Sequence, residues 1–150
     1  MKPPSKLLWA LEVPRGAWGL ASLAGARTML AQAPRGDGRA VMLLPGLFNS
    51  DASGVFLRRY LHRLGYRAEG WGLGRNLGAR TIGPEGERLL ARIRALYDET
   101  GAPVTLIGVS LGGIMARFAA HRLPGMVREV VTISSPFAGD PRATNVWRAF

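Results

Sequence analysis

The chain has 150 residues, of which 47% are hydrophobic and 20% are charged, and this balance is ordinary for one soluble globular domain. It contains no cysteine, which excludes disulfide bonds, thiol catalysis and cysteine-ligated metal sites. The net charge is +10, but the arginines are scattered along the chain, which favours a solvated basic surface over a nucleic-acid-binding one.

Residues 1–37 are predicted to form a helical segment separate from the domain that residues 38–150 build. The segment reads as one or two short amphipathic helices interrupted at Pro14. Residues 7–11 imitate the start of a signal peptide, but Glu12, Pro14 and Arg15 cut this apolar run too short for a leader. No apolar run approaches the ~20 uncharged residues that a transmembrane helix requires. Packing on the domain is favoured over the alternative, a peripheral membrane contact through residues 1–33. We expect a cytoplasmic location.

Ala40–Leu44 is a continuous apolar run, which is typical of a strand buried on both faces. The loop Pro45–Ser50 follows it. A helix capped by Asp51 or Ser53 is expected next, ending at Gly65. The inward face of this helix is predicted to carry Phe56, Leu57, Tyr60, Leu61 and Leu64.

A second short strand, Tyr66–Glu69, precedes the glycine-rich stretch Gly70–Gly78. The glycine spacing fits neither a dinucleotide-binding motif nor a phosphate loop that ends in Gly-Lys-Ser/Thr, so phosphate binding is not predicted. A loop at the carboxyl end of a strand is nevertheless well placed to line a pocket. The residues predicted to line it are Phe48, Trp71, Arg75 and Asn76.

The remaining elements are a helix over residues 83–101, a strand from Val104 to the turn at Ser110, a helix up to Leu123, and a fourth strand over Val127–Ser134. Strands that are almost entirely apolar and that alternate with helices predict an α/β fold. We therefore expect a parallel sheet of about four strands with helices on both faces.

Ser110 lies where a predicted strand meets a predicted helix, and its neighbours indicate a sharp turn. Gly108 and Gly112, two residues before and after it, let the strand and the helix approach without clashes between Cβ atoms. A serine at the tip of such a turn is exposed on strained backbone. Ser110 is therefore the predicted nucleophile.

A set of motifs in this chain resembles the α/β-hydrolase superfamily, and more narrowly its bacterial esterase- or lipase-like members. The motifs, within residues 38–140, are Val41–Leu47, Gly70–Gly78, Gly108–Gly113 and Ile133–Phe137. In that family two backbone N–H groups stabilise the oxyanion of the tetrahedral intermediate, and the resemblance places them at Leu47 and Leu111. Pro45 stands where many relatives have histidine, a change that keeps the backbone donor.

The family's acid and histidine follow the serine along the chain. His62 precedes Ser110, and His121 lies about 16 Å along the helix that follows it, so neither is expected to reach the serine. Asp140 is a weak candidate for the acid. We expect the acid and the histidine beyond Phe150, and this 150-residue form to be inactive or nearly so.

The resemblance implies a serine hydrolase that cleaves carboxylic esters of small molecules or lipids through an acyl-serine intermediate, with no cofactor and no metal. Two alternatives stay open. The first is acyl transfer to an alcohol on the same fold, and the second is a non-catalytic binding or membrane-associated module. No nucleic-acid partner is predicted.

Overall fold

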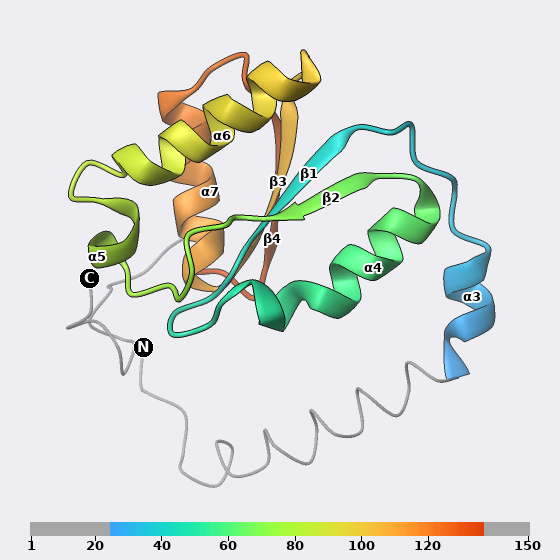
Figure 1. Ribbon diagram of the computed structural model, residues 1–150. Coiled ribbons are helices and arrows are strands. Elements are labelled where there is room, and N and C mark those ends of the chain that lie inside the picture. The colour runs from blue at the N-terminus through green and yellow to red at the C-terminus, as the bar shows by residue number, and fades with distance from the viewer. Residues whose placement is uncertain (1–24, 137–150) are drawn as a thin grey trace, which may run out of the picture.

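The computed structural model describes residues 25–136, which form one four-stranded sheet with helices on both faces (Figure 1). The strands are β1 (Ala40–Leu44), β2 (Arg67–Gly70), β3 (Val104–Val109) and β4 (Val127–Ile133). The helices are α3 (Arg27–Ala31), the 3-10 helix η1 (Asp51–Gly54), α4 (Val55–Leu64), α5 (Ala79–Ile82), α6 (Glu87–Thr100) and α7 (Leu111–Arg122). Asp140 and most of the predicted segment 1–33 lie outside the described residues.

The strands follow the spatial order β2-β1-β3-β4, and each neighbouring pair is parallel. Met42 at the middle of β1 is paired with Glu69 of β2 on one side and with Leu106 of β3 on the other. This register brings the carboxyl ends of β1 and β3 together at one end of the sheet. The predicted parallel sheet of about four strands with helices on both faces is confirmed.

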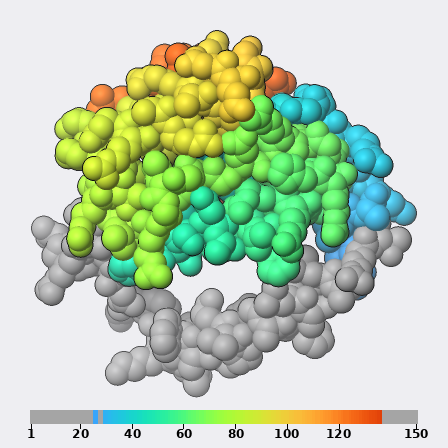
Figure 2. Space-filling model, in the orientation of Figure 1, coloured from blue at the N-terminus to red at the C-terminus, as the bar shows by residue number. Residues whose placement is uncertain are grey.

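The central strands are buried on both faces, which explains their apolar sequences. Alternate side chains of β1 point to opposite sides of the sheet. Met42 and Leu44 pack in the core beneath α6 and α7, whereas Val41 and Leu43 pack in a smaller core beneath α4. In Figure 2 the yellow atoms of α6 lie above and the green atoms of α4 lie below, because the two helices cover opposite faces of the sheet.

The start of α4 differs from the sequence prediction. Asp51 and Ser53 belong to η1, and Gly54 is the N-cap residue of α4, so neither of the two predicted residues caps the α-helix. The predicted end is correct, because Gly65 follows the helix in a left-handed conformation with φ 99°.

One residue of the predicted inward face of α4 points elsewhere. Leu57 and Leu61, which are four residues apart, pack against the sheet. Phe56 precedes Leu57 by one residue, which rotates its side chain about 100° around the helix axis, and it is 79% exposed. The prediction that Phe56 faces inward is therefore wrong.

The chain between β2 and β3 carries two helices where one was predicted. The short helix α5 ends at Gly83, which has φ 91°, and α6 begins only at Glu87. Tyr60 connects α4 to α3, because its hydroxyl donates a hydrogen bond to the Leu30 carbonyl at 3.0 Å.

Among the described residues, no helix is long and apolar enough to cross a membrane.

Candidate active site

Ser110 occupies the turn between β3 and α7 and has φ 50° and ψ −117°, a backbone conformation that serine rarely adopts. Two hydrogen bonds hold it there. The Ser110 N–H donates to the carbonyl of Ile133 at the end of β4 at 2.9 Å, and the Ser110 carbonyl accepts a hydrogen bond from the Gly113 N–H at 3.0 Å. Such strain costs about 1–3 kcal/mol and persists only where the surroundings enforce it. The residue is exposed, as the sequence predicted for the tip of the turn.

Two glycines allow this turn to form against its neighbours. A Cβ atom at Gly108 would overlap the backbone of Gly112, and a Cβ atom at Gly112 would overlap the carbonyl oxygen of Leu44 in β1. Strand β3, helix α7 and the end of β1 therefore meet backbone to backbone. The close approach predicted for Gly108 and Gly112 is present, and it also involves β1, which the sequence did not indicate.

The loop after β1 lies beside the serine. A Cβ atom built on Gly46 would be 3.5 Å from the Cβ of Ser110, an ordinary van der Waals contact. Within residues 25–136, the N–H groups of Leu47 and Leu111 donate no hydrogen bond to another residue. Leu111 is also the first residue of α7, where the helix dipole favours negative charge. Two unpaired donors therefore belong to the two segments that meet at Ser110.

The residues predicted to line a pocket separate into exposed and buried ones. Phe48, with φ 62°, is 58% exposed, and Arg75 is also exposed. Trp71 and Asn76 are fully buried and offer no surface to a bound molecule, which corrects their predicted role. Trp71 fills the core, and its indole N–H donates to the Gly74 carbonyl at 3.0 Å.

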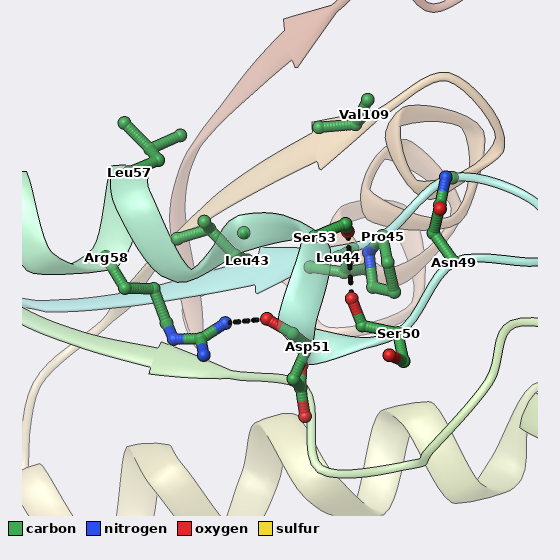
Figure 3. A pocket seen from close by; sticks show the side chains of 12 residues that line it. Leu43, Leu44, Pro45, Asn49, Ser50, Asp51, Ser53, Leu57, Arg58 and Val109 are labelled. Atoms are coloured by element: carbon green, nitrogen blue, oxygen red, sulfur yellow. Dashed lines mark hydrogen bonds between the residues drawn. The ribbon is translucent and has the colours of Figure 1, made fainter.

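A pocket of about 160 Å³ opens on the α4 side of the sheet, next to the serine turn (Figure 3). Gly46 and Val109, the residues that precede Leu47 and Ser110, form part of its wall. Most of its other lining residues come from the loop after β1 and from η1, and Leu43 of β1 and Leu57 of α4 make it largely apolar. None of the four predicted pocket residues lines it. The sequence feature that could have indicated this pocket is Leu57, on the inward face of α4, opposite Leu43 at the end of the apolar strand β1.

Asp51, which lines the pocket, binds the loop after β2 instead of capping α4. Its carboxylate accepts hydrogen bonds from the backbone N–H groups of Trp71 at 2.9 Å and Gly72 at 3.1 Å. Its carbonyl accepts a hydrogen bond from the Arg58 guanidinium at 2.6 Å, drawn as a dashed line in Figure 3. One aspartate thus joins η1 and α4 to the loop that follows β2.

The two histidines lie at the far ends of their helices. His121 is in the last turn of α7, whose first turn adjoins Ser110, and it is exposed. His62 is in the last turn of α4, whose first turn borders the pocket, and it is exposed as well. Within the described residues, therefore, no histidine is placed to take a proton from Ser110.

The shifted pKa values belong to arginine–carboxylate pairs outside the serine turn. Hydrogen bonds from Arg39 lower the pKa of Asp37 to about 2, and both residues precede β1, at the opposite end of the sheet from Ser110. Burial raises the pKa of Glu69, but hydrogen bonds from Arg92 and Arg67 outweigh it and leave that pKa below its usual value. In the described part of the chain, no cluster of three metal-ligating side chains is present.

Comparisons with known proteins identify lipases and other hydrolases that are similar to this chain. No protein-family model matches the chain. Triacylglycerol lipases from Pseudarthrobacter phenanthrenivorans and Burkholderia plantarii are each 44% identical to it over 55 residues, or 36% of the chain. The matched region is 17% of the length of the first lipase and 15% of the second.

Two solved structures share the fold. The mature form of a lipase from Bacillus licheniformis superposes with a TM-score of 0.58 at 24% identity, covering 76% of this chain and 49% of the lipase. A probable hydrolytic enzyme from Pseudomonas aeruginosa gives a TM-score of 0.57 at 26% identity, covering 76% of this chain and 38% of that protein. The fold is that of the α/β-hydrolases, as the motifs around Ser110 predicted.

Proposed function

We propose that this chain supplies the nucleophile and the oxyanion hole of a serine hydrolase that acts on carboxylic esters. The observation that carries the proposal is the strained, exposed Ser110 turn, packed against the loop after β1. The N–H groups of Leu47 and Leu111, on these two segments, donate no hydrogen bond within residues 25–136. The similarity to triacylglycerol lipases supports ester chemistry in particular.

In the proposed reaction, the Ser110 hydroxyl oxygen attacks the ester carbonyl carbon while a general base removes its proton. The N–H groups of Leu47 and Leu111 donate to the oxyanion that develops, and each donor of this kind is worth about 3 kcal/mol in the transition state. The alcohol leaves with a proton, and water then releases the acid from the acyl-serine. We assign the base and its acidic partner to residues that follow Phe150, where the sequence predicts them.

The proposed substrate is a lipid ester or a small-molecule ester with an apolar acyl group. The names of the two similar lipases support the lipid ester, and the largely apolar pocket beside Gly46 and Val109 supports the acyl group. Acyl transfer to an alcohol shares the first half of the reaction, so it is distinguished by the product formed when an alcohol competes with water. Membrane contact through residues 1–33 and a cytoplasmic location stay predictions.

The test compares the complete product of the open reading frame with the 150-residue chain, using p-nitrophenyl esters and a serine-reactive fluorophosphonate. We expect the complete product to hydrolyse the esters and to be labelled at Ser110, and the short chain to be nearly inert. In the complete product, Ser110→Ala should lower kcat by about 10³-fold or more, because no other group replaces the nucleophile. Turnover that survives Ser110→Ala would contradict the proposal.

A second candidate, a non-catalytic module, is favoured by one observation. Both histidines of the described residues lie in the last turn of their helices, away from Ser110. Without a histidine from another part of the protein, Ser110 has no base to take its proton. A complete product that folds but neither turns over esters nor reacts with the fluorophosphonate would select this candidate over the hydrolase.

A further inference from the structure

We propose that Asn76 is a positioning residue of the oxyanion hole, an inference that rests on the proposed function. Asn76 is 0% exposed, and both ends of its amide are paired. Its Nδ2–H donates to the Pro45 carbonyl at 2.7 Å, and its Oδ1 accepts from the Gly78 N–H at 3.0 Å. These partners also determine the amide orientation, since a carbonyl requires a donor and an N–H requires an acceptor.

The backbone of Asn76 contacts the same loop. Its carbonyl accepts a hydrogen bond from the Phe48 N–H at 2.7 Å, and its N–H donates to the Asn49 carbonyl at 2.8 Å. One residue therefore holds the loop after β1 at three points. Pro45 lies two residues before Leu47, and Phe48 and Asn49 are the two residues after it.

Within the described residues, two N–H groups of residues 46–49 donate no hydrogen bond, and they are those of Gly46 and Leu47. Because peptide groups are planar, anchoring the Pro45 carbonyl and the Phe48 N–H restricts the orientation of the Gly46–Leu47 peptide between them. Gly46 has no Cβ and would otherwise let this peptide turn freely. Asn76 thus sets the direction of the Leu47 N–H without itself touching the substrate.

The Asn76 side chain also reaches the element that carries the other donor. Its Nδ2 lies 3.6 Å from the sulfur of Met115, in the second turn of α7, the helix that begins with Leu111. A buried amide between the loop of one donor and the helix of the other keeps the two N–H groups in a constant relative position. This arrangement is what preorganised oxyanion stabilisation requires.

The test uses Asn76→Ala and Asn76→Asp in the complete gene product, with Thr81→Ala as the matched control. The aspartate has the shape of asparagine but places an oxygen against the Pro45 carbonyl. Thr81 makes comparable bonds within the loop that carries Asn76, donating to the Arg75 carbonyl and accepting from the Leu77 N–H, and makes none to residues 45–49. The measurements are kcat and KM for a p-nitrophenyl ester, the affinity for a boronic acid that forms a tetrahedral adduct with Ser110, and thermal unfolding.

We expect both Asn76 variants to lower kcat by about 10- to 100-fold, and the boronic acid affinity by a similar factor, with KM within about twofold of the wild type. Thr81→Ala should stay within about twofold in every constant. Folded Asn76 variants that keep kcat, or that change no more than Thr81→Ala, overturn the inference. If Asn76→Ala does not fold, Asn76→Asp decides; failure of both to fold also overturns it, because Asn76 would then serve the fold.

The same experiment separates this inference from the proposed function. If the wild type hydrolyses no ester, or if Ser110→Ala has the same kcat as the wild type, the proposed function fails. The role of Asn76 then fails with it. If hydrolysis depends on Ser110 while both Asn76 variants retain the wild-type kcat, only the role of Asn76 is overturned.

Discussion

At the residue scale, the absence of side chains matters as much as the presence of the Ser110 hydroxyl. Gly112 lies so close to the end of β1 that a Cβ atom there would overlap the Leu44 carbonyl oxygen and lie 2.8 Å from the Pro45 carbonyl oxygen. Both neighbours are backbone atoms of a central strand and its loop, which cannot rotate out of the way as a flexible side chain could. Any larger residue at this position must push α7 away from β1.

We therefore expect Gly112→Ala to lower the free energy of unfolding by about 2–3 kcal/mol, as measured by urea denaturation. Gly25→Ala is the control, because a Cβ atom at Gly25 meets no atom within 4 Å and should change stability by less than about 0.5 kcal/mol. Equal stability of the two variants would show that α7 and β1 are not in backbone contact.

At the scale of elements, Glu69 joins strand β2 to helix α6. Its carboxylate accepts hydrogen bonds from Arg92 of α6 at 2.6 Å and from Arg67 of its own strand at 2.9 Å. Burial raises the pKa of Glu69, but these two guanidinium groups lower it by more, so the folded-state pKa lies below the unfolded one. A carboxyl with a lowered pKa stabilises the fold above its unfolded pKa, about 4.3, and loses that contribution as the pH falls through its folded pKa.

Glu69→Gln is accordingly expected to reduce stability by about 1 kcal/mol at pH 7 and to have a smaller effect at a second, acidic pH below the unfolded pKa. The control is Glu85→Gln, because the Glu85 side chain is 80% exposed and lies 3.7 Å from Arg122. It should leave stability nearly unchanged at both pH values. Urea unfolding at the two pH values measures both variants, and a pH-independent effect of Glu69→Gln would rule out the ionic origin.

At the scale of the whole molecule, the two edges of the sheet are unlike. Strand β2 is covered by α4 and tied to α6, whereas β4 exposes Val131 and Ile133 by 44% and 41%. Val131 is paired with Ile107, whose side chain belongs to the core on the α4 side, so these residues extend that apolar face beyond α4. An apolar strand at a sheet edge, with unpaired backbone groups, favours association with another strand.

We expect the 150-residue chain to self-associate as its concentration rises, and Val131→Lys to shift it toward the monomer in sedimentation velocity experiments. Arg128→Lys, on the same strand, keeps the charge and should leave the association unchanged. A wild-type chain that is monomeric at high concentration, or an association that Val131→Lys does not weaken, would show that β4 is not the contact surface.

The elements with strong local signals were predicted well. The apolar run of β1 and the glycine at the end of α4 each depend on neighbours within a few residues, and the structure agrees with both. Phe56 was misplaced because it lies about 100° around the helix from Leu57, so the predicted inward face was too wide. Trp71 and Asn76 were misplaced because a glycine-rich loop has no periodicity that tells a buried side chain from an exposed one.

The sequence by itself determined the α/β alternation, the parallel sheet and the strained serine turn, because periodicity, apolar runs and glycine spacing act through local backbone geometry. The tertiary structure alone decided which distant segments meet at that turn. Gly46 adjoins Ser110, and Asn76 binds the Pro45 carbonyl, only because β1 lies between β2 and β3 in a parallel register. Contacts across so many residues follow from strand order, and strand order is set by how whole faces pack together.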